Sequence, residues 1–245
     1  MFQIAAAYAY GKRHNIESVF DLSKCYTPLQ GNTAIRYTNT ILKKVLTSNV
    51  NTIYDHKWVE LGHGYRKIPK LNGKILLHGY FQSDKYFNDF KNDIVNLFQF
   101  PEDINSNINK FIKDRFEDTV TAVHVRRGDY LNNLDIHPTC NIEYYKKAME
   151  EIGEGQFIFI SDDIKWCKEN FKGDNIHYSP FSYELEDLCL ISGCDNQIIA
   201  NSTFSWWGAY LCPWDNNKVI APKLWFGKRG PQEQGDIIPN NWIKF

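Results

Sequence analysis

The stretch TVTAVHVRRGDY, residues 119–130, decides the fold class of this chain. Its first seven residues are β-branched or apolar apart from one histidine, which predicts a buried strand. The strand ends abruptly in two arginines, a glycine and an aspartate. In open parallel sheets, ligands bind beyond the carboxyl ends of the strands, so these charges stand where a binding edge is expected.

The sequence that follows alternates strand and helix patterns. Apolar strand patterns lie at 156–161, 175–179, 196–200 and 218–222. Helical patterns lie before or between them, at 143–152, 162–171, 182–195 and 202–211. We expect Ser161 or Asp162 to cap the helix at 162–171. This alternation predicts an α/β fold with a parallel sheet covered by helices.

The first half of the chain is also α/β, with less regular spacing. We expect a helix from Phe2 to near Gly11, a strand at 18–23, a helix at 32–47, a strand that ends at Gly79, a helix around 86–90 and another that starts at Pro101. A boundary near residue 116 divides the chain into an N-terminal domain, 1–116, and a C-terminal domain, 117–245.

Composition narrows the classes of function. The chain has 28 Lys and Arg against 29 Asp and Glu, so no global charge favours nucleic acid or an anionic membrane. The six cysteines show no CxxC and no metal-ligand spacing, which predicts reduced thiols and no bound metal. No apolar run could span a bilayer, and the apolar start lacks a preceding basic segment, so we expect a cytoplasmic protein.

The paired arginines are the first candidate site. Arg126 and Arg127 are permanent cations whose planar forks suit phosphate oxygens. The sequence has no Walker loop and no dinucleotide-binding glycine fingerprint, so arginine would replace those devices. A surface ion pair with Asp129 or Glu117 explains the same residues equally well. The embedded RGD tripeptide follows an apolar strand and is best explained as chance.

Two more polar clusters follow strands. SDD places Asp162 or Asp163 where acidic residues contact a ribose or a base in nucleotide sites. The stretch NSTFS, residues 201–205, opens a helix, where hydroxyls and backbone N–H groups can bind an anion. A simple helix cap explains the same residues as well. His124 lies on the same side of its strand as Arg126 and is either a core histidine or a phosphate ligand.

With these clusters, the sequence resembles glycosyltransferase family 11, the α-1,2-fucosyltransferases. The resemblance rests on HVRRGDY (124–130), FISDD (159–163), NSTFSWWGAYL (201–211) and GYFQSDKYF (79–87), together with MFQIAAAYA at the start. It implies a GT-B-like fold of two Rossmann-like halves that face a donor cleft. It also implies inverting, metal-independent transfer of fucose from GDP-β-L-fucose to the 2-hydroxyl of a terminal galactose in a glycan, without a cofactor.

The resemblance assigns roles to residues of this chain. The implied donor-binding residues are His124, Arg126, Arg127, Ser161, Asp162, Asp163, Asn201, Ser202, Thr203 and Ser205. Residues 79–86, with Tyr80, Gln82, Ser83 and Tyr86, are implied on the acceptor side. An inverting transfer needs a base and a counter-charge for the leaving diphosphate. Arg126 supplies the counter-charge, and Asp129, which follows the arginines in the same loop, is the base or the group that orients Arg126 or Arg127.

The N-terminus departs from the family pattern. Family members usually begin with a strand and a glycine-rich GGLGNQ loop before the MFQ that here contains Met1. We therefore expect the first strand and its loop to be missing. A second hypothesis follows from this difference: a non-catalytic relative that binds the donor or a glycan. A third is a fucosyltransferase of different linkage.

Overall fold

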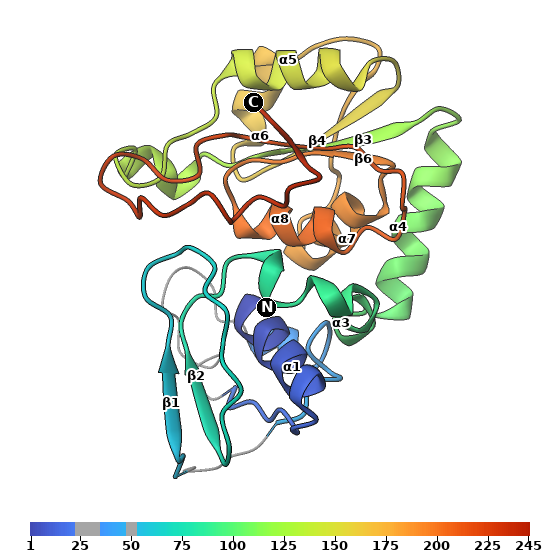
Figure 1. Cartoon of the computed structure of the whole chain (residues 1–245). Helices are drawn as coiled ribbons and strands as arrows, with labels where there is room; N and C mark the ends of the chain where they lie inside the picture. The colour runs from blue at the N-terminus through green and yellow to red at the C-terminus, as the bar shows by residue number, and fades with distance from the viewer. Residues whose placement is uncertain (23–34, 48–52) are drawn as a thin grey trace. The chain divides into compact units, whose positions relative to one another are not determined.

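The computed structural model describes residues 1–22, 35–47 and 53–245 (Figure 1). The chain forms two compact units, the first of Met1–Pro101 with Glu233–Pro239 and the second of Glu102–Gln232 with Asn240–Phe245. We expected one boundary near residue 116, but the main segment of the first unit ends at Pro101, and Glu233–Pro239 also belongs to that unit. The boundary differs because the helix α4 (Glu102–Arg115) packs against a helix of the second unit, α7 (Glu184–Gly193).

The second unit contains a six-stranded parallel sheet. Its strands, in spatial order, are β5 (Ile176–Tyr178), β4 (Gln156–Ser161), β3 (Val120–Val125), β6 (Asn196–Ile198), β7 (Val219–Ala221) and β8 (Ile243–Lys244). All of the strand pairs are parallel. From β3 the chain adds strands toward one edge, and from β6 it adds them toward the other. The α/β expectation is confirmed, and the topological switch point lies between β3 and β6.

Helices cover both faces of this sheet. Figure 1 shows α5 (Ile142–Ile152) and α6 (Ile164–Asn170) on one face, and α7 and α8 (Thr203–Tyr210) on the other. All six residues of β3 are buried, as a central strand covered on both faces requires. One cluster of the core packs Tyr145 and Ala148 of α5 with residues of β3, β4 and α6.

Strand register places the polar clusters at one edge. Val125 pairs with Ser161, so Arg126 and Asp162 each follow the last paired residue of their strands. Val123 pairs with Ile198, which brings the segment after β6 to the same carboxyl edge. The expectation that the three clusters meet is confirmed for the backbone.

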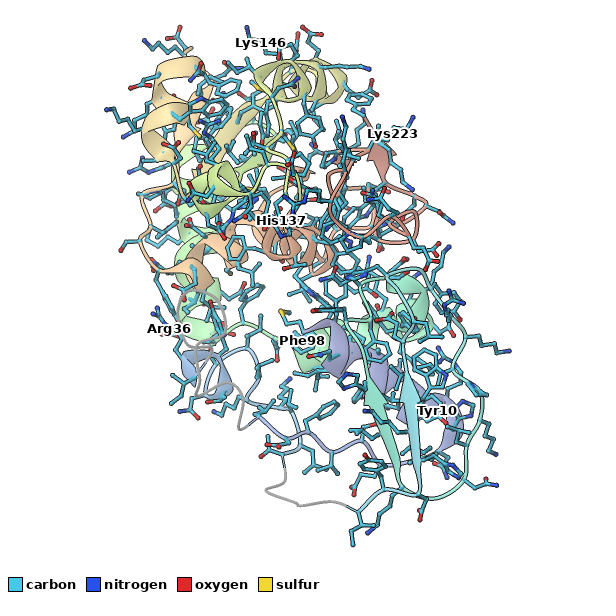
Figure 2. All side chains as sticks on the ribbon, turned by 90° about the vertical axis from the view of Figure 1, so that its left-hand side faces the viewer. Tyr10, Arg36, Phe98, His137, Lys146 and Lys223 are labelled. Atoms are coloured by element: carbon cyan, nitrogen blue, oxygen red, sulfur yellow. The ribbon has the colours of Figure 1, made fainter. Side chains whose placement is uncertain are left out.

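The first unit has a smaller sheet. Strands β1 (His56–Val59) and β2 (Ile75–His78) pair in parallel, with Val59 opposite His78. Its helices are α1 (Phe2–His14), α2 (Ile35–Thr38), the 3-10 turns η2 (Asp84–Tyr86) and η3 (Asn88–Phe90), and α3 (Lys91–Leu97). Tyr10 of α1, labelled in Figure 2, lies in this unit and donates its hydroxyl to the carbonyl of Pro69 at 3.1 Å.

Several expectations for the first unit are wrong in detail. The helix at 32–47 is reduced to α2 and turns, and residues 32–34 lie outside the described part. The hydroxyl of Thr38 bonds the carbonyl of Ile35 at 2.7 Å, and such bonds compete with the helical ladder. Around 86–90 the chain forms the two 3-10 turns instead of a helix. The segment at 18–22 makes an isolated bridge between Phe20 and Thr47, and Ser23 is not described.

Gly11 does not end α1, which continues to His14 and is closed by Asn15 in the left-handed region at φ 56°. A Cβ at Gly11 would lie 2.3 Å from Ser18 Oγ and 2.5 Å from the carbonyl of Ile16. This glycine therefore permits a close approach of the following segment. Within α1 the glycine is tolerated because packing outweighs its low helix propensity.

Two composition expectations concern thiols and membranes. Among the described residues, the cysteines Cys140, Cys167, Cys189, Cys194 and Cys212 are all unbridged, and Cys25 lies outside that part. In the described ranges, no helix has both the length and the apolar character needed to cross a membrane.

Candidate functional site

Arg126 stands directly after β3 and is held by two carboxylates. Its Nη2 lies 2.5 Å from Asp129 Oδ1, and its Nη1 lies 2.9 Å from Asp162 Oδ2. The guanidinium also lies 5.2 Å from the ring centre of Tyr130. With its side chain 33% exposed, the cation is fixed in direction but remains accessible to a ligand. The ion pair with Asp129 that we considered from the sequence is present, whereas within the described residues neither arginine pairs with Glu117.

Arg127 is anchored by a different carboxylate. Its Nε donates to Asp163 Oδ2 at 3.0 Å, and its guanidinium lies 4.2 Å from the ring centre of Trp166. The hydrogen bond from Arg127 lowers the pKa of Asp163. The backbone N–H of Arg127 donates to Asp162 Oδ1 at 2.9 Å, so Asp162 bridges both arginines.

The close approach of these segments requires a glycine after the arginines. A Cβ at Gly128 would lie 2.4 Å from Asp162 Oδ2. That oxygen is held by Arg126, so it could not move away without breaking the ion pair. The sequence Arg-Arg-Gly-Asp therefore has a structural reason for its third residue.

A 3-10 turn links the arginines to the segment after β6. The turn η4 (Gly128–Asn132) contains Tyr130, whose hydroxyl donates to the carbonyl of Asn201 at 3.1 Å. Burial raises the pKa of Tyr130 to about 12, so the phenol remains a donor. His137, labelled in Figure 2, stacks on the Tyr130 ring at 4.8 Å. These contacts connect the ends of β3 and β6.

His124 is buried and neutral. Its ring lies 5.4 Å from that of Phe204 in α8, and only 5% of the residue is exposed. Burial, with a smaller contribution from the charge of Arg126, lowers its pKa to about 3. Its Nδ1 has no hydrogen-bond partner among the described residues. An unsatisfied buried polar atom beside a binding edge is a candidate contact for a ligand or an ordered water.

The start of α8 has the features of an anion site. Ser202 is the N-cap residue, yet its side chain accepts no hydrogen bond from the first turn in the described structure. The helix cap therefore does not explain this serine, and the first N–H groups of α8 remain available to an acceptor. Thr203 is exposed at the first helical position.

Asn201 and Ser205 point into the interior. The Asn201 amide donates to the carbonyls of Pro138 at 2.8 Å and Trp225 at 2.9 Å, and the residue is 1% exposed. Ser205 is fully buried and donates toward the carbonyls of Ala200 and Ser202. In this structure both side chains hold the turn before α8, and their direct contact with the donor substrate remains a prediction.

The expected cap of α6 is corrected. Neither Ser161 nor Asp162 is the N-cap, because Asp163 takes that position and accepts from the N–H of Trp166 at 3.2 Å. Ser161 accepts from the N–H of Asp163 at 2.9 Å and so supports the cap.

In the first unit, residues 79–86 form a turn beyond β2. Tyr80 is 61% exposed and its ring stacks on His63 at 5.1 Å. Ser83 is buried and accepts from the N–H of Lys85, while the buried Tyr86 donates to Glu60. Gln82 has a buried Oε1 with no partner in the described part of the chain.

Sequence reasoning assigned no role to several residues that shape these sites. Trp166 and Phe204 carry no signal in the sequence, because aromatic residues at these positions fit core packing equally well. Glu60 follows a short strand that the pattern did not predict. No group of three or more His, Cys, Asp or Glu side chains in the described ranges could hold a metal ion.

Comparison with known proteins identifies the family of this chain. The family profile described as Glycosyl transferase family 11 matches residues 5–245. An α-1,2-colitosyltransferase of Escherichia coli is 32% identical over 94% of this chain and 80% of its own length. The O-antigen biosynthesis glycosyltransferase WbnK of the same species is 36% identical over 72% of this chain and 62% of its own. Galactoside α-(1,2)-fucosyltransferase 2 of Hylobates lar is 26% identical over 72% and 56%.

The chain thus spans between about half and four fifths of the length of these relatives. Among solved structures, the fucosyltransferase NodZ from Bradyrhizobium matches 94% of this chain and 91% of its own, with a TM-score of 0.55 and 12% identity. At that identity the likeness concerns the fold, and it confirms the expected GT-B-like class. On the profile match over nearly its whole length, the chain belongs to glycosyl transferase family 11.

Proposed function

We propose that this enzyme transfers L-fucose from GDP-β-L-fucose to the 2-hydroxyl of a terminal β-galactoside. The observation that carries the proposal is the meeting of Arg126, the unpartnered nitrogen of His124 and the start of α8 at the switch point of the second unit's sheet. A switch point is where open α/β sheets bind nucleotides. The relatives described as α-1,2-fucosyltransferases support the sugar and the linkage.

Arg126 binds the diphosphate in this account. A guanidinium carries five N–H donors, and the contacts with Asp129 and Asp162 each engage one terminal nitrogen, which leaves N–H groups for phosphate oxygens. The two carboxylates hold the plane of the fork, so little side-chain entropy is lost on binding. Ser202 and Thr203 present the start of α8 to the same anion.

The nucleoside lies farther along the same edge. Asp162 and Asp163 each accept hydrogen bonds from the arginines. Carboxylate oxygens have further acceptor capacity, which a ribose hydroxyl or a base N–H can use. Arg127 is the less exposed of the two arginines, at 18% of its side chain, and acts mainly to hold this segment.

The reaction is a displacement at the anomeric carbon. The galactoside 2-oxygen forms a bond to that carbon, the bond to the β-phosphate oxygen breaks, and GDP leaves with the electron pair. Arg126 stabilises the negative charge that develops on GDP, so the transfer needs no metal in this account. Asp129, 66% exposed, takes the proton of the attacking hydroxyl. Its other possible role is to orient Arg126, with which it is paired.

Residues 79–86 of the first unit bind the acceptor in this proposal. Tyr80 offers an exposed aromatic ring, which can stack on a sugar, and Gln82 has a buried oxygen with no partner in the described residues. A second donor is also favoured by a specific observation. The colitosyltransferase relative covers 94% of this chain at 32% identity, which makes GDP-colitose the competing donor.

The test combines binding and turnover. Calorimetric titrations with GDP, GDP-fucose, GDP-colitose, GDP-mannose and UDP-galactose measure donor choice, and coupled release of GDP in the presence of lactose measures transfer. The proposal expects GDP-fucose to bind and turn over, while UDP-galactose does neither. Preference for GDP-colitose would reassign the donor. Binding of GDP-fucose without turnover would favour the non-catalytic alternative.

A further inference from the structure

A buried carboxylate stands at the carboxyl end of the small sheet in the first unit. Glu60 directly follows β1, is 8% exposed, and donates its backbone N–H to the carbonyl of His78 at the end of β2. A buried charge is costly unless hydrogen bonds compensate it. The hydrogen-bond partners of Glu60 therefore indicate the structural role of its carboxylate.

Those partners belong to the turn at residues 79–86. Glu60 Oε2 accepts the backbone N–H groups of Tyr80 at 2.7 Å and Phe81 at 2.8 Å. Glu60 Oε1 accepts the hydroxyl of Tyr86 at 2.8 Å. Burial raises the pKa of Tyr86, so its phenol remains protonated and continues to donate. One carboxylate thus binds both the start and the end of the turn.

The backbone of the turn is shaped for this contact. A Cβ at Gly79 would lie 2.5 Å from Glu60 Cβ, so only glycine permits the approach. Phe81 has φ 55°, a left-handed conformation that is uncommon for a bulky residue. The ring of Phe81 is buried, stacked on Trp58 and edge-on to Tyr86. The left-handed conformation of Phe81 is therefore held by the hydrogen bond to the Glu60 carboxylate and by the contacts of its ring.

The turn presents one exposed ring beside these buried groups. Tyr80 donates the shortest of the three hydrogen bonds through its N–H, and its exposed ring stacks on His63. An aromatic ring fixed in this way can take a sugar ring without ordering itself on binding. The backbone bond to Glu60 determines where that ring stands.

We infer that Glu60 is the positioning residue of the acceptor-binding turn, which sets acceptor affinity without touching donor or acceptor. The inference rests on the proposed function, since that assigns residues 79–86 to the acceptor. It distinguishes Glu60 from Asp129: Glu60 acts only through hydrogen bonds to the turn, and the donor residues lie in the other unit.

Two variants test the inference by kinetics. Glu60→Ala removes every acceptor, and we expect the KM for the galactoside to rise at least tenfold while the affinity for GDP changes less than twofold. Glu60→Gln keeps one oxygen for the two N–H groups, and its amide can donate to the Tyr86 oxygen, so it should restore the acceptor KM to within about threefold of wild type. Glu17→Gln, at an exposed glutamate of the same unit, is the matched control.

Hydrogen exchange gives a readout that does not depend on activity. The amides of Tyr80 and Phe81 should be protected in wild type and in Glu60→Gln, and exchange at least tenfold faster in Glu60→Ala. If Glu60→Ala does not fold, Tyr86→Phe removes the hydrogen bond to Glu60 together with the one that the hydroxyl accepts from the N–H of Arg66. This variant keeps the carboxylate and should raise the acceptor KM by a few fold with GDP affinity unchanged. An unchanged acceptor KM in a folded Glu60→Ala, or equal losses for donor and acceptor, would overturn the inference.

Failure of the proposed function gives a different pattern. In that case wild type shows no transfer, whereas the exchange experiment still reports whether Glu60 holds the turn. Protected amides that do not respond to the loss of Glu60 would refute the positioning role by themselves. If the amides exchange faster in Glu60→Ala, wild type is active and the acceptor KM of the variant is unchanged, then Glu60 holds the turn but the turn does not bind the acceptor, and the inference is overturned.

Discussion

Replacing Arg126 by alanine should abolish most transfer while the fold persists. The side chain is 33% exposed, and its partners Asp129 and Asp162 are 66% and 27% exposed. Exposed ion pairs of this kind contribute about 0–1 kcal/mol each, because water screens them. We therefore expect Arg126→Ala to lose no more than about 2 kcal/mol of unfolding free energy.

The effect on the transition state is larger. A unit charge about 4 Å from the departing phosphate contributes about 4 kcal/mol at an effective dielectric constant of about 20. Loss of one positioned donor in an enzyme site typically costs about 3–4 kcal/mol, which is about 10²–10³ in kcat. The variant also leaves Asp162, formerly paired with Arg126, as an unbalanced anion beside the diphosphate.

The assay measures initial rates of GDP release with lactose as acceptor, alongside calorimetric GDP binding and thermal unfolding by circular dichroism. Arg115→Ala is the matched control, because Arg115 is an arginine of α4 that lies over the Phe111 ring in the same unit. We expect a loss of at least 100-fold in kcat/KM for Arg126→Ala and less than twofold for the control. Equal effects of the two variants, or a kcat within threefold of wild type in Arg126→Ala, would refute the counter-charge role.

Three other substitutions test neighbouring parts of the site. Asp129→Asn should lower kcat about 100-fold with GDP affinity within threefold, as loss of a general base does, whereas parallel losses would assign Asp129 to orienting its arginine. Gly128→Ala should weaken GDP binding at least tenfold by displacing Asp162, whereas Gly235→Ala, whose added Cβ meets no described atom within 4 Å, should leave it unchanged. Burial lowers the pKa of His124 from 6.5 to about 3, so the unfolded chain binds a proton there that the folded protein excludes. The contribution of His124 to the free energy of unfolding should therefore fall by about 1.4 kcal/mol for each pH unit as the pH drops from about 6 to 4. His124→Gln should weaken this dependence in urea unfolding, and identical slopes would contradict the assignment.

The fold of the second unit could be predicted because its strands are buried on both faces. A central strand such as β3 is then a short run that is rich in β-branched residues, and its alternation with helical patterns along the chain identifies it as a strand. In the first unit, β1 is largely exposed, with the sequence His-Lys-Trp-Val, so it has no such pattern. The helix expected at 32–47 was wrong because threonine hydroxyls bond nearby carbonyls, and sequence periodicity does not report that competition.

The sequence predicts which residues lie at the binding edge, because the ends of the strands determine their backbone positions. Placing Arg126, Asp162 and the start of α8 at one edge needs only the parallel order of the strands. The directions of the side chains could not be predicted, because nothing in the sequence shows that Asn201 points inward or that Asp163 caps α6. The hold of Glu60 on residues 79–86 depends on the pairing of two short strands that periodicity does not reveal.

The most direct test of the central claim is the structure of the product. Enzyme, GDP-β-L-fucose and lactose are incubated together, and the trisaccharide is analysed by proton NMR for its anomeric configuration and linkage, with released GDP quantified in parallel. The account predicts an α-linked fucose on the galactose 2-oxygen and one GDP for each trisaccharide. A β-linked product, attachment at another hydroxyl, or GDP binding without any trisaccharide would contradict it.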